Sequence, residues 1–340
     1  MKETVVVGMS GGVDSSVAAY LLKEQGYNVI GVTMQIWQDE DVCTLEHEGG
    51  CCGLSAVDDA RRVADVLEIP YYVMNFKQEF QTNVIGYFVR EYQAGRTPNP
   101  CIACNRYVKW ESLLQRSIEI GADYIATGHY ARIKQLPNGR YAIANSVTAR
   151  KDQTYALYNL TQEQLRRTLM PVGEYEKERV RQIAEEVGLP VAHKPDSMEI
   201  CFVPDGDYAS YIEQATGKPS VPGNFVYGGG QSLGQHKGII HYTVGQRKGL
   251  GLALGYPAFV VQIRPETNEV VIGSLEHNLS HHVYAREMNF MGEEMFDENA
   301  VYQGKIRYNH AGAACHIVRR ADDLYECIFE EPQRGVTPGQ

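Results

Sequence analysis

Strand and helix patterns alternate along roughly the first 130 residues, and this alternation restricts the fold more than any other feature of the chain. The β-branched run Thr4–Val7 is followed by a glycine-rich loop and by VAAYLLKEQ, a helical pattern that stops at Gly26. The elements expected next are, in order, a strand over 27–34, a helix over 56–69, a strand over 70–76, a helix over Val108–Ile120 and a strand over 122–131. Such alternation predicts an α/β fold with right-handed crossovers and a doubly wound parallel sheet.

Three of these expected strands end at residues that suggest a ligand site, namely Gly8, Met34 and Gly128. In an open parallel sheet the carboxyl ends of the strands lie along one edge, and ligands bind in the crevice outside that edge. We therefore expect all three strand ends to face the same crevice.

The character of the sequence changes after residue 205. Glycine and proline become frequent beyond Pro204, most densely in KPSVPGNFVYGGGQSLGQHKG, and short strand patterns follow. The expected strands are IIHYTV, AFVVQIR, EVVIG, VYQGKIRY, AACHIVRR and LYECIFEE. Short strands separated by turn residues predict an all-β tail that forms a small barrel. We expect three domains, at 1–205, 206–275 and 276–340.

Composition excludes several classes of protein. The chain begins with Met1-Lys2-Glu3 and a strand pattern rather than a signal peptide, and no apolar stretch reaches the length of a membrane span. We therefore expect a cytoplasmic protein without a membrane partner. The net charge of −10 argues against non-specific nucleic-acid binding, so a nucleic-acid partner would need a local basic patch. Eight cysteines in such a long chain indicate reactive or buried thiols rather than a disulfide scaffold.

The loop GMSGGVDSS, Gly8–Ser16, has the composition of a phosphate-binding loop. Glycine-rich turns and helix N-termini bind anions through backbone N–H groups, and we expect a helix to begin near Ser15 with Asp14–Ser16 as cap residues. The lysine of the GxxxxGK[ST] loop is missing, and the spacing does not fit GxGxxG. The remaining pattern, SGGVDS, resembles the pyrophosphate loop of the N-type ATP pyrophosphatases.

That resemblance implies a reaction in which the α-phosphorus of ATP is attacked and pyrophosphate leaves as a magnesium complex. The metal then supplies charge that a lysine supplies in other loops, so ATP with Mg²⁺ is the expected cofactor. By this resemblance the nucleotide-binding residues are Gly8, Met9, Ser10, Gly11, Gly12, Val13, Asp14, Ser15, Met34 and Gly128.

Two cysteine motifs suggest that sulfur attacks the activated atom. They are TPNPCIACN, Thr97–Asn105, and SMEICFVP, Ser197–Pro204. Together with ATGHYAR, KDQTYAL, EICFVPDGDY and GQHKGIIHYTVGQRKGLG, they occur in an order that resembles the bacterial tRNA-specific 2-thiouridylase family over nearly the whole chain. The resemblance implies an ATP pyrophosphatase domain, a small adaptor domain and a C-terminal β-barrel. It also implies ATP-dependent 2-thiolation of the wobble uridine in tRNAs for lysine, glutamate and glutamine.

The same resemblance assigns roles to two cysteines. Cys201 matches the residue that receives a persulfide from a cysteine desulfurase or a sulfur-relay protein, and Cys104 matches the nucleophile that frees the sulfur and ends in a disulfide with Cys201. An ordinary thiol, with a pKa of ~8.5, is mostly protonated at neutral pH, so we expect a helix N-terminus near Asn105 to lower that pKa. Packing is assigned to Cys43, Cys315 and Cys327, and Cys51 and Cys52 receive no role.

Residues of the expected tRNA interface follow from composition and from the resemblance. The segment 300–321 holds no acidic residue in an acidic protein, and its basic and aromatic residues are Lys305, Arg307, Arg319, Arg320, Tyr302, Tyr308, His310 and His316. By the resemblance, the residues expected to contact tRNA are Asn99, Pro100, Cys101, His129, Lys151, Asp152, Gln153, Arg307, Tyr308 and Gln340. We predict no metal site built from the histidines.

The sequence departs from the family at two places. Cys101 stands where many members have aspartate, so a carboxylate role beside the base does not transfer to this chain. The chain also stops at RGVTPGQ, where the family continues into at least one more strand, and we expect an incomplete barrel.

Three alternatives remain open. Cys101, Cys104 and Cys201 together suit an iron–sulfur cluster, as in related tRNA thiolases with three cysteines, although both cysteine motifs follow the family branch that uses a persulfide. The loop alone would also suit a sister adenylating ligase, which needs neither paired cysteines nor a cationic β tail. A non-catalytic nucleotide-binding or tRNA-binding module would not need the cysteines at all.

Overall fold

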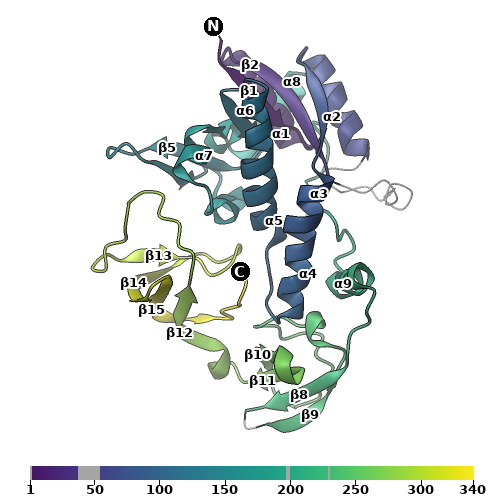
Figure 1. The fold of residues 1–340 in the computed structure, drawn as a ribbon, viewed down its shortest axis with the longest axis vertical. Helices are drawn as coiled ribbons and strands as arrows, with labels where there is room; N and C mark the ends of the chain where they lie inside the picture. Colours follow the sequence, from purple (N-terminus) through teal and green to yellow (C-terminus); the bar gives the residue numbers. More distant parts are fainter. Residues whose placement is uncertain (1, 37–53, 197–199, 229) are drawn as a thin grey trace. The chain divides into compact units, whose positions relative to one another are not determined.

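The computed structural model describes residues 2–36, 54–196, 200–228 and 230–340. The assignments considered for Cys43, Cys51 and Cys52 lie outside the described residues. The chain forms two compact units, which we describe separately (Figure 1). The first unit comprises Met1–Ile85, Cys101–Gly206 and Met291–Glu293. The second unit comprises Gly86–Pro100, Asp207–Phe290 and Glu294–Gln340. Our division into three domains stays a prediction.

A five-stranded sheet in the order β3-β2-β1-β4-β7 forms the centre of the first unit. Its strands are β1 (Thr4–Gly8), β2 (Asn28–Gln35), β3 (Tyr71–Asn75), β4 (Tyr124–Thr127) and β7 (Thr168–Leu169). Every pairing between neighbouring strands is parallel. The predicted doubly wound sheet is therefore confirmed, and its strand order reverses between β1 and β4, the kind of switch point at which such sheets bind ligands.

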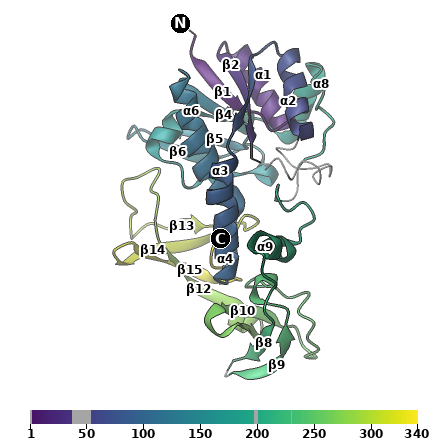
Figure 2. The same ribbon diagram turned by 45° about the vertical axis from the view of Figure 1, so that its right-hand side comes forward.

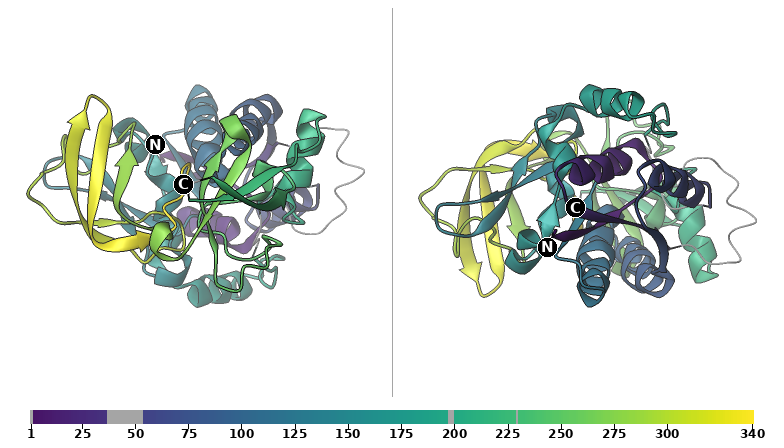
Figure 3. Two further views of the ribbon diagram at one scale, coloured as in Figure 1. Left: turned by 90° about the horizontal axis from the view of Figure 1, so that it is seen from below. Right: turned by 90° about the horizontal axis from the view of Figure 1, so that it is seen from above.

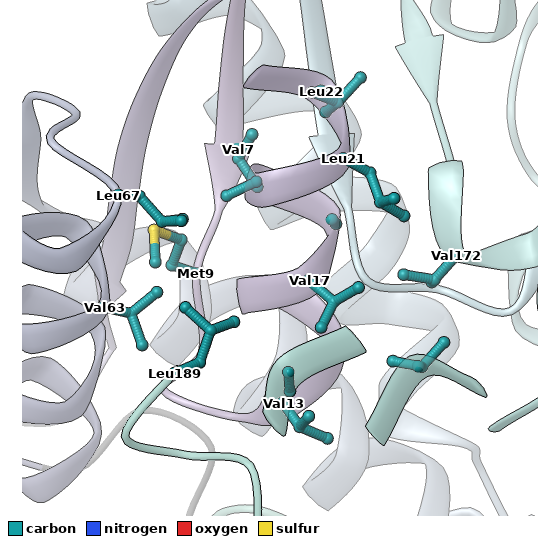
Figure 4. Packing of buried hydrophobic residues seen from close by; sticks show 14 of the residues in the cluster. Val7, Met9, Val13, Val17, Leu21, Leu22, Val63, Leu67, Val172 and Leu189 are labelled. Atoms are coloured by element: carbon teal, nitrogen blue, oxygen red, sulfur yellow. The ribbon is translucent and has the colours of Figure 1, made fainter. Parts of the chain in front are cut away.

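One face of this sheet packs against α1 (Val13–Glu24), α2 (Leu54–Val66) and α8 (Lys177–Glu186), which Figure 2 shows together. Apolar side chains from the sheet, from these helices and from the segments next to them meet beside the glycine-rich loop (Figure 4). Those labelled are Val7, Met9, Val13, Val17, Leu21, Leu22, Val63, Leu67, Val172 and Leu189. Burial of this cluster holds the start of α1 against the end of β1, and the loop between them is fixed as a result.

The other face of the sheet is covered by one long helical stretch. It consists of α5 (Pro100–Ala103), the π-helical segment η3 (Cys104–Leu113) and α6 (Leu114–Glu119). Helix α6 packs against β4. Trp110 is almost completely buried, and its indole N–H donates a hydrogen bond to Thr168 Oγ1 of β7 over 2.8 Å. A polar anchor thus ties this helical stretch to the edge of the sheet.

Shorter elements complete the first unit. Strands β5 (Ala131–Gln135) and β6 (Tyr141–Asn145) form an antiparallel hairpin. The remaining helical segments are α3 (Lys77–Phe80), η2 (Gln81–Ile85), η4 (Ala149–Lys151), η5 (Thr154–Leu157), α7 (Gln162–Arg166) and η6 (Pro171–Glu174). The hairpin and the last four of these segments lie between β4 and α8 along the chain. They bring the residues after Gly128 back to the glycine-rich loop.

The second unit contains two four-stranded sheets (Figure 3). The sheet in the order β10-β11-β8-β9 comprises β8 (Gly223–Tyr227), β9 (Gln231–His236), β10 (Phe259–Arg264) and β11 (Glu269–Gly273). The sheet in the order β12-β15-β14-β13 comprises β12 (Leu279–Ala285), β13 (Tyr302–Gly304), β14 (Ala313–Ala321) and β15 (Leu324–Arg334). The predicted β character of this part of the chain is confirmed.

Helices are short in the second unit. They are α4 (Gly86–Gln93), α9 (Tyr208–Thr216) and the 3-10 segments η7 (Ile239–His241), η8 (Pro265–Thr267) and η9 (Glu276–Asn278). Across both units, no described helix combines the length and the apolar character that a membrane span requires.

Several strands of the second unit differ from the prediction. IIHYTV does not form a strand, because its first residues form η7, entered through Gly238 with a φ of +128°. Strands β8, β9 and β12 were missed, because GNFVY, QSLGQH and LSHHVYA lack a sustained β-branched pattern. VYQGKIRY forms only the short β13. Glycine turns and cross-strand pairing, rather than local propensity, determine these elements.

The buried hydrogen bond between Trp110 and Thr168 allows a test of the packing in the first unit. Thr168→Val keeps the side-chain shape but leaves the indole N–H without its acceptor and removes the hydrogen bond from Thr168 Oγ1 to Gln164 O, so the free energy of unfolding should fall by about 1–3 kcal/mol. The control, Thr82→Val at an exposed helical position, should change it by less than about 0.5 kcal/mol. Urea unfolding followed by tryptophan fluorescence measures both. Equal losses in the two variants would contradict the anchoring role of this bond.

Candidate functional site: a glycine-rich loop and a buried ion network

The glycine-rich loop joins the central strand of the sheet to α1. Gly8 ends β1, Gly12 occupies the N-cap position, and Val13 is the first helical residue. The prediction that Asp14–Ser16 cap this helix is therefore wrong, since these residues already lie in its first turn. No side chain caps the helix, so its first backbone N–H groups are available to an anion.

Serine hydroxyls fold the loop back on itself. Ser15 and Ser16 donate their hydroxyl hydrogens to the Gly12 carbonyl oxygen over 3.2 and 2.8 Å. Ser15 Oγ also accepts a hydrogen bond from the Ser10 backbone N–H over 3.2 Å. The loop is therefore preorganised by its own side chains, and binding an anion would not need to order it first.

Two glycines are required here by close approaches to neighbouring backbone. Gly11 has a φ of +68°, and a Cβ atom at this position would lie 2.4 Å from Ala56 O. A Cβ atom at Gly128, directly after β4, would lie 2.5 Å from the Ser15 nitrogen. The end of β4 therefore touches the start of α1. With Met34 near the end of the parallel neighbour β2, the three predicted strand ends do lie at one edge of the sheet.

A lysine from α8 reaches the aspartate of the loop. Lys177 Nζ donates to both carboxylate oxygens of Asp14, over 2.7 and 2.9 Å, and the Tyr130 hydroxyl donates to Asp14 Oδ1 over 2.7 Å. The Lys177 side chain is only 8% exposed, against 29% for Asp14. Burial and the neighbouring Asp14 charge raise the pKa of Tyr130, so its hydroxyl stays a donor at neutral pH. A buried ammonium and a phenol thus hold the loop aspartate.

A second carboxylate, Asp196, shares this lysine. Its oxygens lie 2.9 Å from Lys177 Nζ, 2.7 Å from Lys151 Nζ and 2.8 Å from Arg181 Nη2. Burial raises the pKa of Asp196, but the hydrogen bonds from Lys151 and Lys177 outweigh that effect and hold the pKa at about 2. Asp196 is therefore ionised at neutral pH and accepts from three cations at once.

Lys194 forms a separate tie to the loop. Its Nζ donates to Gly11 O over 3.1 Å and to Asp59 Oδ2 of α2 over 2.6 Å. Sequence reasoning missed the side chains that bind the loop, Tyr130, Lys177 and Lys194. It also missed Asp196, which binds Lys177, and Arg181, which binds Asp196. Two signals were available, because KPD at 194–196 precedes the EICFVP motif and Tyr130 follows His129. The basic residues of α8 carry no comparable local signal.

The cysteine motif at 101–104 lies in a helix rather than before one. Helical structure begins at Pro100, a residue suited to the first helical position, and Cys104 is the first residue of η3. The expected helix N-terminus near Asn105 is therefore wrong, and the first turn contains Cys101 instead. Cys101 is exposed, whereas Cys104 is partly buried.

Cys201 is partly buried and lies in a turn. The next residue, Phe202, packs on a helix of the first unit. The ring of Phe202 meets that of Phe80 edge-to-face, with centroids 5.7 Å apart. Phe80 ends α3, and α3 packs against η3, the segment that Cys104 begins. The elements that carry Cys104 and Cys201 therefore share a packing partner. The disulfide between them stays a prediction.

The thiols of Cys315 and Cys327 have the properties expected of packed cysteines. Cys315 is buried and Cys327 partly buried. Burial raises the pKa of both, that of Cys327 to about 11. Both thiols are thus protonated and weakly nucleophilic at neutral pH.

His129 lies at the end of β4 with a neutral ring. Its Nδ1 is 2.7 Å from Thr127 Oγ1, and its ring lies 5.5 Å from that of Trp110. Burial lowers the pKa of His129 well below its usual value, and the nearby Lys109 charge lowers it further. The imidazole therefore offers a neutral surface for stacking or hydrogen bonding, not a cation.

The KDQ segment connects to the loop residues through side chains. Lys151 binds Asp196, and the Asp152 carboxylate accepts from the Ser146 backbone N–H over 2.8 Å. Gln153 Oε1 accepts from the Tyr130 N–H over 2.9 Å, and the Gln153 N–H donates to Tyr130 O. Asp152 and Gln153 thus hold backbone, while Lys151, at 40% side-chain exposure, reaches the surface.

The remaining candidate residues lie in the second unit. Arg307 Nη1 donates to Arg334 O over 2.8 Å, and Tyr308 is 41% exposed. Gln340 Nε2 donates to Thr97 O over 2.9 Å, so its amide supports the TPNP segment. Within that segment Asn99 is partly buried and Pro100 is buried.

The donor chemistry for metals is sparse among the described residues. Across them, no three histidine, cysteine, aspartate or glutamate side chains are placed to hold a metal ion together. The carboxylate of the loop itself is Asp14, a hard oxygen donor of the kind that Mg²⁺ prefers.

Comparison with known protein families covers almost the whole chain. Residues 3–205 match the model described as a tRNA methyl transferase HUP domain. Residues 210–274 match a tRNA methyl transferase PRC-barrel domain, and residues 280–340 match an aminomethyltransferase beta-barrel domain. The fold class expected from the sequence is confirmed by these matches together with the parallel sheet.

Individual relatives are similar over almost their full length. A tRNA-specific 2-thiouridylase MnmA from Lachnoclostridium phytofermentans is 70% identical over 99% of this chain and 94% of its own length. Proteins of the same name from Clostridioides difficile and Clostridium perfringens are 54% and 57% identical, each over 100% of this chain and 94% of their own length.

Alanine substitutions at two glycines with positive φ test the loop geometry. Gly11→Ala forces a strained φ and a backbone clash, so we expect ATP affinity to fall at least about tenfold. Gly121→Ala is the control, because Gly121 has a φ of +88°, lies after α6 outside the loop and has no atom within 4 Å of its added Cβ. It should change ATP affinity by less than about threefold. Calorimetry measures both, and similar losses would contradict the assigned role of Gly11.

Proposed function

Because this chain belongs to the tRNA-specific 2-thiouridylase family, we propose that it uses ATP to replace the 2-oxygen of a tRNA uridine with sulfur. The observation that carries this proposal is the SGGVDS loop, folded on its own serines at the uncapped start of α1, in one unit with Cys104 and Cys201. The loop suits release of pyrophosphate, and the cysteines suit sulfur transfer.

In the first step, the uridine 2-oxygen attacks the α-phosphorus of ATP, and pyrophosphate leaves. The backbone N–H groups at the start of α1 would hold the β and γ phosphates, supported by the helix dipole. Mg²⁺, when bound with the nucleotide, supplies positive charge to the leaving pyrophosphate, and Asp14 is the loop carboxylate that would hold it. Gly128 keeps the end of β4 close enough to complete this site.

In the second step, a persulfide on Cys201 supplies the sulfur. Its terminal sulfur attacks C2 of the adenylated uridine, and AMP leaves. The Cys104 thiolate then attacks Cys201 Sγ, which forms a Cys104–Cys201 disulfide and leaves the second sulfur on the tRNA. A cysteine desulfurase or sulfur-relay protein would load the persulfide, and an external dithiol would reduce the disulfide.

The tRNA would be held by both units. Asn99, Pro100, Cys101, His129 and the KDQ segment would line the approach of the target base, with the neutral His129 ring as a stacking surface. Arg307, Tyr308 and Gln340 would contact the backbone. The wobble uridine, in tRNAs for lysine, glutamate and glutamine, is the substrate that the family resemblance favours.

Other functions fit the site less well. The matched family models carry the description methyl transferase, yet methyl transfer has no use for a pyrophosphate loop. A sister adenylating ligase does not require the cysteine pair. A non-catalytic binding module requires neither the cysteine pair nor a loop that releases pyrophosphate. An iron–sulfur cluster on Cys101, Cys104 and Cys201 would be a distinct route for the same substrate, but in the described part of the chain these three side chains are not placed to hold a metal ion together. Cysteine variants separate this route from the persulfide route.

Cysteine variants test the proposed sulfur step. Cys104→Ser and Cys201→Ser should abolish 2-thiouridine in nucleoside analysis of tRNA while retaining tRNA-dependent pyrophosphate release, because adenylation precedes sulfur transfer. Cys101→Ser is the matched control and should keep thiolation at a reduced level. Loss of thiolation in all three variants, in a protein that is brown when purified without oxygen, would favour the cluster route. Full thiolation by Cys201→Ser would overturn the proposed mechanism.

Arg307→Ala tests the backbone contact. Arg307 uses one donor on Arg334 O and has others with which to bind a phosphate, so the variant should bind every tRNA substrate more weakly. The slope of log Kd against log salt concentration should fall by about 1, since one phosphate contact is lost. Arg264→Ala, whose arginine pairs with Glu269, serves as the control and should keep the slope. An unchanged slope for Arg307→Ala would remove this residue from the interface.

A further inference from the structure

A continuous chain of ion pairs connects the KDQ segment to the ATP loop. Lys151 binds Asp196 over 2.7 Å, Asp196 binds Lys177 over 2.9 Å, and Lys177 binds Asp14 over 2.7 Å. The side chains in the middle of this chain, Asp196 and Lys177, are 22% and 8% exposed, whereas those at its ends, Lys151 and Asp14, are 40% and 29% exposed. The middle is therefore shielded from water, and both ends are partly open to solvent.

A second connection runs parallel to the first. Gln153 and Tyr130 exchange two hydrogen bonds, of Gln153 Oε1 with the Tyr130 N–H and of the Gln153 N–H with Tyr130 O. The Tyr130 hydroxyl then donates to Asp14. The backbone around Lys151 is thereby held at a fixed distance from the loop, so the ion pairs can respond to a ligand without the segment moving as a whole.

Lys177 is shared between two carboxylates, and its position depends on the balance between them. Asp196 divides its negative charge among Lys151, Lys177 and Arg181. Arg181 is fixed, because it also donates to the carbonyls of Ala192 and Lys194. If Lys151 leaves Asp196, it no longer repels Lys177 there, and the attraction between Asp196 and Lys177 becomes stronger. Such changes are large for buried charges, because the dielectric constant inside a protein is low.

We propose that Asp196 and Lys177 are positioning residues that couple tRNA binding at Lys151 to nucleotide binding at Asp14. This inference rests on the proposed function. When a tRNA phosphate binds Lys151, Lys151 leaves Asp196. Lys177 then shifts toward Asp196, and its ion pair with Asp14 weakens. The Asp14 carboxylate then becomes available to the magnesium complex of ATP. Adenylation is thereby favoured when the tRNA is bound, and hydrolysis of ATP in the absence of tRNA is limited.

Thermodynamic linkage gives the coupling a measurable form. If bound tRNA tightens the binding of the nucleotide by a certain factor, bound nucleotide tightens the binding of tRNA by the same factor. The coupling factor is defined as the Kd of tRNA alone divided by its Kd with saturating Mg²⁺ and α,β-methylene ATP, an analogue that cannot release pyrophosphate. For the full-length protein and an unmodified transcript of a substrate tRNA, we expect a factor of at least about 5.

Asp196→Asn is the decisive variant. It keeps the side-chain shape but removes the charge that joins Lys151 to Lys177, so the coupling factor should fall below about 2. Asp59→Asn is the matched control, because Asp59 also pairs with a lysine at the loop, Lys194, but lies outside the chain of ion pairs that runs from Lys151 to Asp14. Its coupling factor should remain that of the wild type. Thermal unfolding shows whether both variants are folded.

A second variant covers the case in which Asp196→Asn does not fold. Lys151→Gln, at the more exposed end of the chain, should weaken tRNA binding and also bring the coupling factor below about 2. A wild-type coupling factor in either folded variant, or an equal loss in Asp59→Asn, would overturn the proposal. A wild-type protein that binds both ligands with a factor of 1 would overturn it too and leave the proposed function intact. Failure to bind either ligand would instead refute the proposed function itself.

Discussion

The ion pair between Lys177 and Asp14 is the interaction on which the candidate site depends. The loop contains Asp14, although a negative side chain would repel an anion bound at the loop. The buried ammonium group of Lys177 neutralises that charge. Removing one partner of a buried pair typically costs ~3–5 kcal/mol, because the other charge is left uncompensated. The same pair joins α8 to α1, and therefore holds together the two helices whose apolar residues form the core beside the loop.

The centre of the first unit was predictable from sequence because its signals are local. A β-branched run, a glycine loop and a helical pattern follow one another within 26 residues, and each specifies its own conformation. The parallel order of the strands then follows from the alternation, so that the meeting of Gly8 and Gly128 at one edge of the sheet could be inferred. Matches to the pyrophosphate loop and to the cysteine motifs likewise depend on short contiguous patterns.

What the sequence did not reveal is non-local. Asp14 and Lys177 are 163 positions apart, and the basic residues of α8 read as an ordinary solvated helix face. The predicted caps of α1 failed because the helix begins at Val13 with Gly12 at the N-cap position, so Asp14–Ser16 already lie in its first turn. In the second unit, β8, β9 and β12 are stabilised by their neighbours in the sheets, and their own composition gives little sign of it.

The π-helical segment at Cys104–Leu113 has a consequence for how the chain tolerates change. A π-helix bonds each residue to the fifth along instead of the fourth, so it holds more residues per turn than an α-helix. If this segment relaxed to α geometry at constant length, each residue would wind further around the helix axis, and Cys104 would rotate relative to Trp110. Cys104 would then leave its side of the helix while the buried side stayed in place. The π geometry of this segment, as much as its residue types, therefore sets the direction of the thiol.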